Sequence, residues 1–204
     1  SAGERATLAA MAARDPQLRL VEYASLDAGQ LLFNQRPAGR RTPLFADQAL
    51  RVALSAAVDR ATAVRAVLDT LGHVGLGPVT RADATADTTL RHIAFDTAAA
   101  GRALDALGWR WNAARTVRER AGRPLAFDVL VPAVSRTRMQ LAVVLQAQLA
   151  RVGARVGVDA VEPGVFAERL ARGDFDAALH VVRNDPTPAT LRQAWGTVRG
   201  DDPG

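Results

Sequence analysis

The chain has 204 residues, of which 49% are hydrophobic and 23% are charged, and it contains no cysteine. This length suits one large domain or two small ones with a buried core. The missing cysteine excludes a disulfide framework, a thiol nucleophile and a cysteine-ligated metal. No apolar run reaches the ~18–20 residues that span a bilayer, and the first residues lack the basic-then-apolar pattern of a signal peptide. We therefore expect neither a transmembrane segment nor a signal sequence in this chain.

The basic charge of the chain does not by itself predict nucleic-acid binding. All 26 basic residues are arginine, which keeps its charge to very high pH, so a net charge of only +5 gives a sequence pI of about 11.1. Arginines are interspersed with acids, for example around Glu119 and Asp174, and aromatic residues make up only 5% of the chain. That is too few for a base-stacking platform. We expect no nucleic-acid partner, and a basic nucleic-acid-binding module remains an alternative only.

The first half of the chain combines helical spacing with short runs of strand period. Its most regular helix places Leu50, Leu54 and Val58 on one stripe. Residues 71–90 begin glycine-rich and are weakly patterned, which predicts a long surface loop. The expected elements are helices over residues 4–13 and 45–58, strands over 18–23 and 30–34, and a helix capped by Asp59 that continues through residue 68.

The second half alternates strands with helices. That order predicts an α/β fold, with a mixed, largely parallel sheet flanked by helices and right-handed crossovers. No repeat or low-complexity linker interrupts the chain, so we expect a single domain over residues 1–204. The expected elements are a helix from Asp96-Thr97 to Gly108, a strand over 125–131, a helix over 136–152 capped by Ser135 and closed by Gly153, a strand over 154–161, a helix from Pro163 to Arg172, a strand over 175–182 and a last helix starting at Thr187-Pro188.

The stretch GDFDAALHVVRNDPTP carries the main candidate site. It runs from a helix end through an apolar strand into an Asp-Pro turn, and it ends on the carboxylate of Asp185. Ligands of open α/β folds bind at such strand ends, so Asp185 could pair with a cationic ligand group such as a free amino terminus. It could equally be a turn residue that caps local amides. Arg183 would share its face and could pair with Asp185 or with a ligand carboxylate.

The sequence does not predict a metal site or a catalytic site. His73, His92 and His180 are far apart, whereas a metal needs convergent ligands. On its strand, His180 fits a packed or hydrogen-bonded side chain better than a metal ligand. The segment GHVGLGP fits neither a dinucleotide fingerprint nor a phosphate loop, and no G-x-S-x-G elbow is present. We therefore expect no enzyme activity, no cofactor and no metal.

Five segments, taken together, resemble the extracytoplasmic solute-binding proteins of ABC importers, in the oligopeptide, dipeptide and nickel group known as family 5. They occur in the family's order and span about residues 26–200. These segments are LLFNQRPAG, FADQALRVALSAAVDRATAVRAVL, HIAFDTAAAGRALDALGW, GRPLAFDVLVP with RMQLAVVLQAQLARVGARVGV, and GDFDAALHVVRNDPTP.

The resemblance implies that the chain is the C-terminal lobe of a larger two-lobe protein, of the periplasmic-binding-protein type II-like fold. A solute, such as a peptide or a related small molecule, would lie between this lobe and a first lobe that is absent here, and an ABC-transporter membrane permease would be the partner. The family's acidic residue that meets a peptide amino group falls on Asp185, while its usual tryptophan falls on Val182. The stretch between Pro78 and His92 is also shorter than the family's loop.

The leading hypothesis is a non-catalytic, extracytoplasmic binding module for import. Its predicted ligand-binding residues are Asp185, Arg183, Asn184, Val182 and His180. An enzyme or receptor built on the same lobe is an alternative, as is the nucleic-acid-binding module.

Overall fold

The computed structural model describes residues 2–23, 25–35, 44–77, 79–80, 86–183 and 187. The chain divides into two compact units. The first comprises Ser1–Gln30, Thr70–His92 and Val181–Gly204, and the second comprises Leu31–Asp69 and Ile93–His180. Strands β1 (Asp27–Phe33) and β7 (Ala177–Arg183) each have residues in both units.

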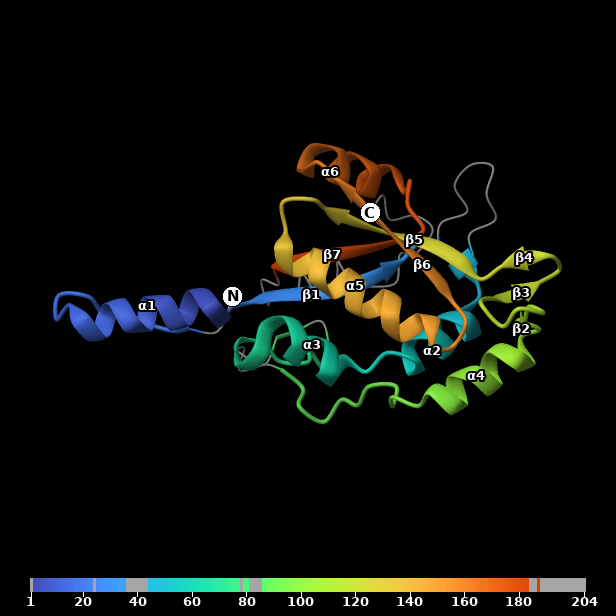
Figure 1. Ribbon diagram of the computed structural model, residues 1–204, viewed down its shortest axis with the longest axis horizontal. Coiled ribbons are helices and arrows are strands. Elements are labelled where there is room, and N and C mark those ends of the chain that lie inside the picture. The colour runs from blue at the N-terminus through green and yellow to red at the C-terminus, as the bar shows by residue number, and fades with distance from the viewer. Residues whose placement is uncertain are drawn as a thin grey trace. The chain divides into compact units, whose positions relative to one another are not determined.

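The main sheet has four strands in the order β1-β7-β5-β6 (Figure 1). Strand β5 (Ala126–Pro132) pairs in parallel with β6 (Arg155–Val161) and with β7. Strand β1 runs antiparallel to β7, because the amide of Asn34, just after β1, donates to the carbonyl of Asp176, just before β7, at 2.9 Å. The mixed, largely parallel sheet predicted from the sequence is confirmed.

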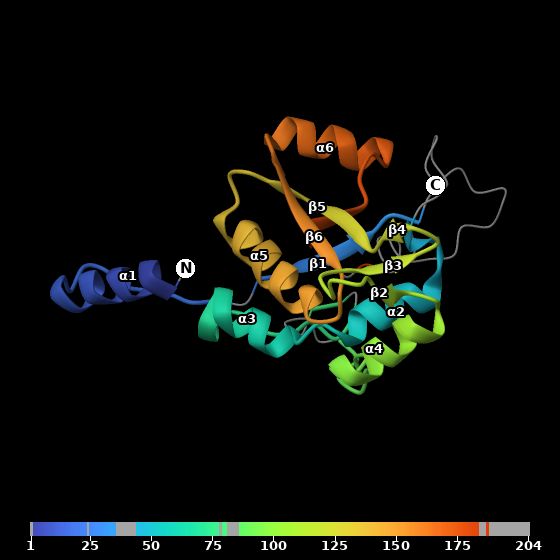
Figure 2. The ribbon, with the colours of Figure 1, turned by 45° about the vertical axis from the view of Figure 1, so that its right-hand side comes forward.

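Helices α5 (Arg136–Ala150) and α6 (Pro163–Arg172) cover opposite faces of this sheet (Figures 1 and 2). The strand order requires this arrangement. Strands β6 and β7 lie on either side of β5, so the crossovers β5-α5-β6 and β6-α6-β7 travel in opposite directions across the sheet. Two right-handed crossovers of opposite direction must use opposite faces.

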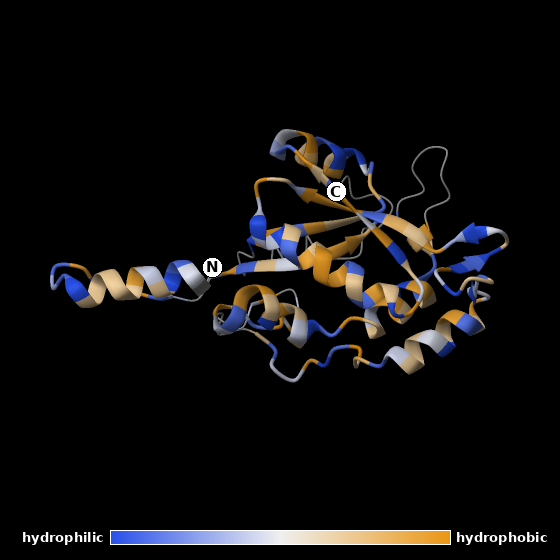
Figure 3. Ribbon diagram, viewed as in Figure 1, coloured by the Kyte–Doolittle hydropathy of each residue, from blue (hydrophilic) through white to orange (hydrophobic). Residues whose placement is uncertain are grey.

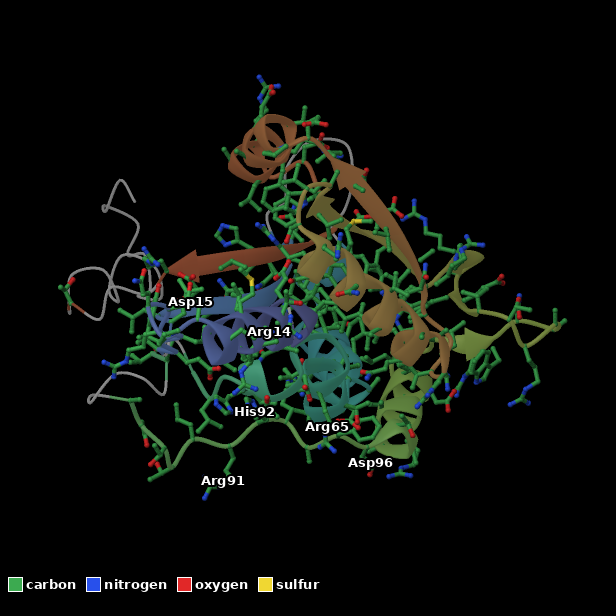
Figure 4. The ribbon with its side chains drawn as sticks, turned by 60° about the vertical axis from the view of Figure 1, so that its left-hand side comes forward. Arg14, Asp15, Arg65, Arg91, His92 and Asp96 are labelled. Atoms are coloured by element: carbon green, nitrogen blue, oxygen red, sulfur yellow. The ribbon has the colours of Figure 1, made fainter. Side chains whose placement is uncertain are left out.

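Side-chain caps start four of the described helices, and three of them, at Asp59, Asp96 and Ser135, lie where the sequence predicts a helix start. Asp47, Asp59, Asp96 and Ser135 each accept a hydrogen bond from a backbone amide in the first turn. Figure 4 shows Asp96 at the start of its helix. The remaining helices of the second unit are η1 (Leu44–Ala46), α2 (Gln48–Ala56), α3 (Arg60–Leu68) and α4 (Thr97–Ala106), and η2 (Asp69–Leu71) follows α3.

The larger hydrophobic core lies on the α5 face of the sheet. It joins side chains of α2, α4 and α5 to alternate residues of β5, and α2 packs against α4. Figure 3 shows apolar colour along parts of β5 and α5. At its centre, Phe45 packs between Phe33 and Phe127, with ring centroids 4.4 and 4.9 Å away. A smaller cluster on the other face consists of Leu130, Phe166 and Ala178.

A small antiparallel sheet, which the sequence did not predict, lies between α4 and β5. Its strands are β2 (Arg110–Trp111), β3 (Arg118–Arg120) and β4 (Arg123–Pro124). Buried Arg118 attaches it to neighbouring parts of the second unit. Its guanidinium donates to the carbonyls of Val152 (2.8 Å) and Trp109 (2.7 Å) and to the carboxylate of Asp105 (2.7 Å).

In the first unit, helix α1 (Ala2–Arg14) confirms the helix predicted over 4–13. The strand predicted over residues 18–23 is wrong. This segment has no regular secondary structure, and its side chains, including Tyr23, are exposed. Apolar alternation makes a strand only where a neighbouring strand pairs with it. The described part of the loop over 71–90 has no helix or strand beyond the turn that ends at Leu71, as predicted. The helix predicted to start at Thr187-Pro188 lies outside the described residues from Pro188 on.

No helix among the described residues is long and apolar enough to cross a membrane.

Candidate functional site

The candidate site lies at the carboxyl edge of the parallel strands. Neighbouring strands β5 and β6 both end there, and the chain leaves β5 toward α5 and β6 toward α6 on the opposite face. The amide of Ala133 donates to the carbonyl of Val161 at 2.8 Å and holds the two strand ends together. In open α/β sheets, such a divergence of connections creates the place where ligands bind.

Three side chains from this edge form a layered group, here called the Arg–Phe–His stack. Arg138 comes from the first turn of α5, Phe166 from the first turn of α6, and His180 from β7. The guanidinium carbon of Arg138 lies 5.6 Å from the ring centroid of Phe166. The rings of Phe166 and His180 are stacked, with centroids 6.5 Å apart and an interplanar angle of 16°. Two consecutive strand–helix units and the strand that follows them thus each contribute one member.

The stack combines a cation with a neutral imidazole. Burial lowers the pKa of His180 below its ordinary value, and the positive charge of Arg138 lowers it further. His180 is therefore uncharged at neutral pH. Burial also lowers the pKa of Arg138, but an arginine in a protein stays protonated.

Arg138 has no carboxylate partner among the described residues. Its Nε donates to the hydroxyl of Ser135 at 3.2 Å, and that hydroxyl also caps α5 by accepting from the amide of Arg138. A partly buried guanidinium with one neutral acceptor and an aromatic face retains donors for an incoming carboxylate or carbonyl.

The five residues predicted from the sequence fall into two groups. Asn184 and Asp185 lie outside the described residues, so their proposed roles stay predictions. The other three lie on β7, where alternation places His180 and Val182 on one face and Arg183 on the other. Arg183 is 77% exposed and pairs with Asp27 at 3.1 Å, so its described partner is neither a ligand nor Asp185.

Sequence reasoning missed two members of the stack, Arg138 and Phe166. A signal was available, because each follows a predicted strand within the first turn of the next helix, Arg138 after Ser135 and Phe166 after Pro163. Within the described ranges, no group of histidine, cysteine, aspartate and glutamate side chains could hold a metal ion.

Comparisons with known proteins agree with this architecture. The sequence profile of the bacterial extracellular solute-binding proteins, family 5 Middle, matches residues 3–201. The chain therefore belongs to this family of solute-binding proteins. The resemblance noted in the sequence is confirmed, and so is the α/β fold class that it implies.

Named relatives and solved structures show how much of a protein the chain represents. It is 33% identical to the oligopeptide-binding protein OppA of Mycobacterium tuberculosis over 164 residues, which is 76% of this chain and 27% of OppA. The structure of the oligopeptide-binding protein AppA of Bacillus subtilis, in complex with a nonapeptide, matches with a TM-score of 0.73 and 24% identity, over 80% of this chain and 32% of AppA. The structure of NikZ from Campylobacter jejuni, in complex with Ni(L-His), matches with a TM-score of 0.75 and 23% identity, over 91% and 36%. The chain thus spans between a quarter and about a third of the length of these relatives.

Proposed function

We propose that this chain binds a solute without chemical change, as one lobe of an extracytoplasmic binding protein that delivers its ligand to the membrane permease of an ABC importer. Family membership supports binding rather than catalysis, because the relatives described above are named for binding. The chain covers only about a third of the solved relatives. A first lobe would then supply the second wall of the site and close over the ligand.

The observation that carries this proposal is the Arg–Phe–His stack at the carboxyl edge. It offers a cation, an apolar ring and a neutral imidazole on one wall. A ligand carboxylate could accept hydrogen bonds from Arg138, and each charge-assisted bond of this kind contributes roughly 1.5–3 kcal/mol. The imidazole of His180 can donate or accept, so it suits a neutral amide or carbonyl beside that carboxylate.

The ligand class that fits best is a peptide or another small solute with a carboxylate. AppA is described with a nonapeptide and NikZ with Ni(L-His), and both ligands contain carboxylate groups. In this proposal, Asp185 holds the ligand's amino group and Arg138 its carboxylate, so one lobe would recognise both ends of a short zwitterion. Val182 stands where the family usually has tryptophan, which favours ligands that need no aromatic wall on that side.

Titration of the isotopically labelled chain with trialanine, followed by NMR, tests this proposal directly. We expect fast-exchange shifts at the Arg138 side-chain Nε–H and the His180 ring, with weak affinity because one wall of the site is missing. Arg138→Gln should abolish the shift at the His180 ring. Arg136→Gln, an exposed substitution on the first turn of the same helix, should leave both shifts unchanged.

Two results would contradict the proposal. Shifts at His180 that persist in Arg138→Gln would show that Arg138 does not bind the peptide and that the stack is not the binding site. The absence of any shift with trialanine, with carboxylate-free peptide amides and with the nickel–histidine complex would remove solute binding by this edge. For Asp185, Asp185→Ala in a protein with both lobes should weaken peptide binding by roughly 1–3 kcal/mol, and unchanged affinity would leave it a turn residue.

A further inference from the structure

The positive charge of the chain is concentrated in one stretch. Residues 106–158 contain nine arginines and only two acidic residues, Glu119 and Asp128. Their excess of seven positive charges is larger than the net charge of +5 for the whole chain. The interspersion of arginines with acids therefore does not hold here, and a general preference for arginine over lysine does not explain why acids are missing.

Folding brings most of these arginines to one end of the second unit. We define the arginine pole as the exposed arginines of the small sheet, of its loop between β2 and β3, and of the segment from the turn after α5 to the first residue of β6. The amide of Arg118 on β3 donates to Gly153 at 2.8 Å, and the amide of Arg155 donates to Leu125 at 2.8 Å, so this turn lies beside the small sheet. Figure 3 shows β3 and β4 in the hydrophilic colour. The members of the pole are Arg110, Arg115, Arg120, Arg123, Arg151 and Arg155.

The pole is poorly neutralised within the described residues. Arg110 alone has a carboxylate partner there, Asp105 at 3.1 Å, and Asp105 is shared with buried Arg118. Across the turn between β3 and β4, Arg120 stands directly opposite Arg123. Like charges in such a cross-strand pair destabilise a sheet. Arg110, by contrast, stands opposite Glu119. The Arg120–Arg123 pair is therefore unfavourable for the free chain, and an anionic surface would supply its counter-charge.

Arginine side chains lie over the aromatic rings near the pole, which bears on the kind of partner. Trp109 is only 2% exposed, and the guanidinium of Arg120 lies 4.8 Å from its ring centroid. The guanidinium of Arg118 lies 5.1 Å from the ring of Trp111. Because these rings are capped by arginines, they offer no platform on which bases could stack. The pole instead presents guanidinium groups, which pair with phosphate oxygens.

We propose that the arginine pole docks the protein on the phosphate headgroups of an anionic phospholipid bilayer. The family is extracellular, and outside the cell membrane the phospholipid headgroups form an extended phosphate-rich surface. Clusters of four to eight exposed arginines or lysines bind such surfaces through charge attraction, which weakens within a Debye length. The pole lies on the small sheet and on the turn that follows α5, so it uses residues other than the Arg–Phe–His stack.

Vesicle sedimentation of the whole chain tests this inference. The probes are vesicles of equal parts phosphatidylglycerol and phosphatidylcholine, and vesicles of phosphatidylcholine alone. The variant Arg123→Gln/Arg151→Gln/Arg155→Gln removes three charges from the pole. The control Arg14→Gln/Arg19→Gln/Arg65→Gln removes three exposed charges elsewhere, so both proteins have the same net charge. Circular dichroism and thermal unfolding establish that both remain folded.

We expect the wild-type chain and the control to bind the anionic vesicles, with an affinity that falls as salt is added. Neither should bind vesicles of phosphatidylcholine alone. The pole variant should bind at least tenfold more weakly, since each arginine near a bilayer contributes about fivefold. Equal losses in the pole variant and the control would overturn the proposal. So would binding to both vesicle types alike, or a single-stranded RNA that binds the pole more tightly than the anionic vesicles at the same salt.

Discussion

The side-chain amide of Gln148 forms two hydrogen bonds with the backbone of Asp59. Its Oε1 accepts from the Asp59 amide at 2.9 Å, and its Nε2 donates to the Asp59 carbonyl at 3.2 Å. Gln148 is buried on α5, whereas Asp59 is the residue that caps α3. This pair therefore fixes the junction between α2 and α3 against the helix that covers the main sheet.

Gln148→Met should destabilise the protein by about 1–3 kcal/mol, because it leaves the partly buried amide of Asp59 without its acceptor. The free energy of unfolding, measured by urea denaturation, checks this value. Gln140→Met makes the same chemical change at an exposed position of α5 and should cost much less. Equal effects at the two positions would mean that helix propensity, rather than the two hydrogen bonds between Gln148 and Asp59, determines the loss of stability.

Arg118 and Arg110 share the carboxylate of Asp105 but differ in burial, which makes them a matched pair. The Arg118 side chain is 5% exposed and that of Arg110 is 68% exposed. Arg118→Gln should cost about 1–3 kcal/mol for the buried carbonyls that lose their donor, while Asp105 keeps Arg110 as a partner. Arg110→Gln should cost no more than about 1 kcal/mol. Chemical denaturation of both variants checks this, and similar losses would rule out a structural role specific to Arg118.

The same pair predicts a dependence on pH. The hydrogen bond from Arg118 lowers the pKa of Asp105 below its ordinary value, and Arg110 lowers it further. A lowered carboxyl pKa contributes stability that is present above the unfolded-state value of about 3.9 and is lost as the pH falls through the folded-state value. The stability difference between the wild type and Asp105→Asn should therefore shrink in acid. A stability difference that stays constant from neutral to acidic pH would show that the bonds of Asp105 to Arg118 and Arg110 are not the source of that difference.

Gly153 is expected to resist substitution for two separate reasons. Its φ of +83° is one that L-residues rarely adopt, and an added Cβ would lie 2.7 Å from Cγ of Arg118 and 2.9 Å from Cη2 of Trp111. Gly153→Ala should cost about 1–3 kcal/mol from the backbone alone, with the steric conflict added. Gly164→Ala on α6, where the added Cβ meets nothing within 4 Å, should be neutral or slightly stabilising. Thermal unfolding of the two variants makes the comparison.

His180 should titrate below the ordinary histidine pKa of about 6.5, because burial first and Arg138 second disfavour its charged form. NMR of the imidazole ring measures the midpoint directly. Arg138→Gln should raise the pKa of His180 without restoring it fully, since burial is the larger cause. The contribution of His180 to the free energy of unfolding is fully present above about pH 6.5. It is lost as the pH falls through the pKa of His180 in the folded state. A pKa at or above the ordinary value would contradict the described environment of His180.

Much of the fold could be predicted because its helices begin and end with local signals. Asp59, Asp96 and Ser135 each cap the helix that the sequence predicts, and Gly153 and Gly173 end α5 and α6 with positive φ. The small sheet could not be predicted in this way. Its strands have only two or three residues, too few to show a period of two, and its stability depends on the distant contacts of Arg118.

The candidate site was only partly accessible to sequence reasoning. His180 was found because its strand ends in a conspicuous turn. Arg138 and Phe166 were not, because they meet His180 only after two crossovers bring three strand ends to one edge. Local patterns give the caps of α5 and α6 but not the register that aligns their first turns with β7.

The unequal apolar layers on the two faces of the sheet have a consequence for motion. Beneath α6, the buried cluster in the described chain consists of Leu130, Phe166 and Ala178, whereas α5 rests on the larger core. Because local opening is easiest where little apolar surface is lost, the amides of α6 should exchange with deuterium earlier than those of α5. Phe166 would then move during local opening of α6 while Arg138 stays in place. One side of the carboxyl edge could therefore adjust to solutes of different size.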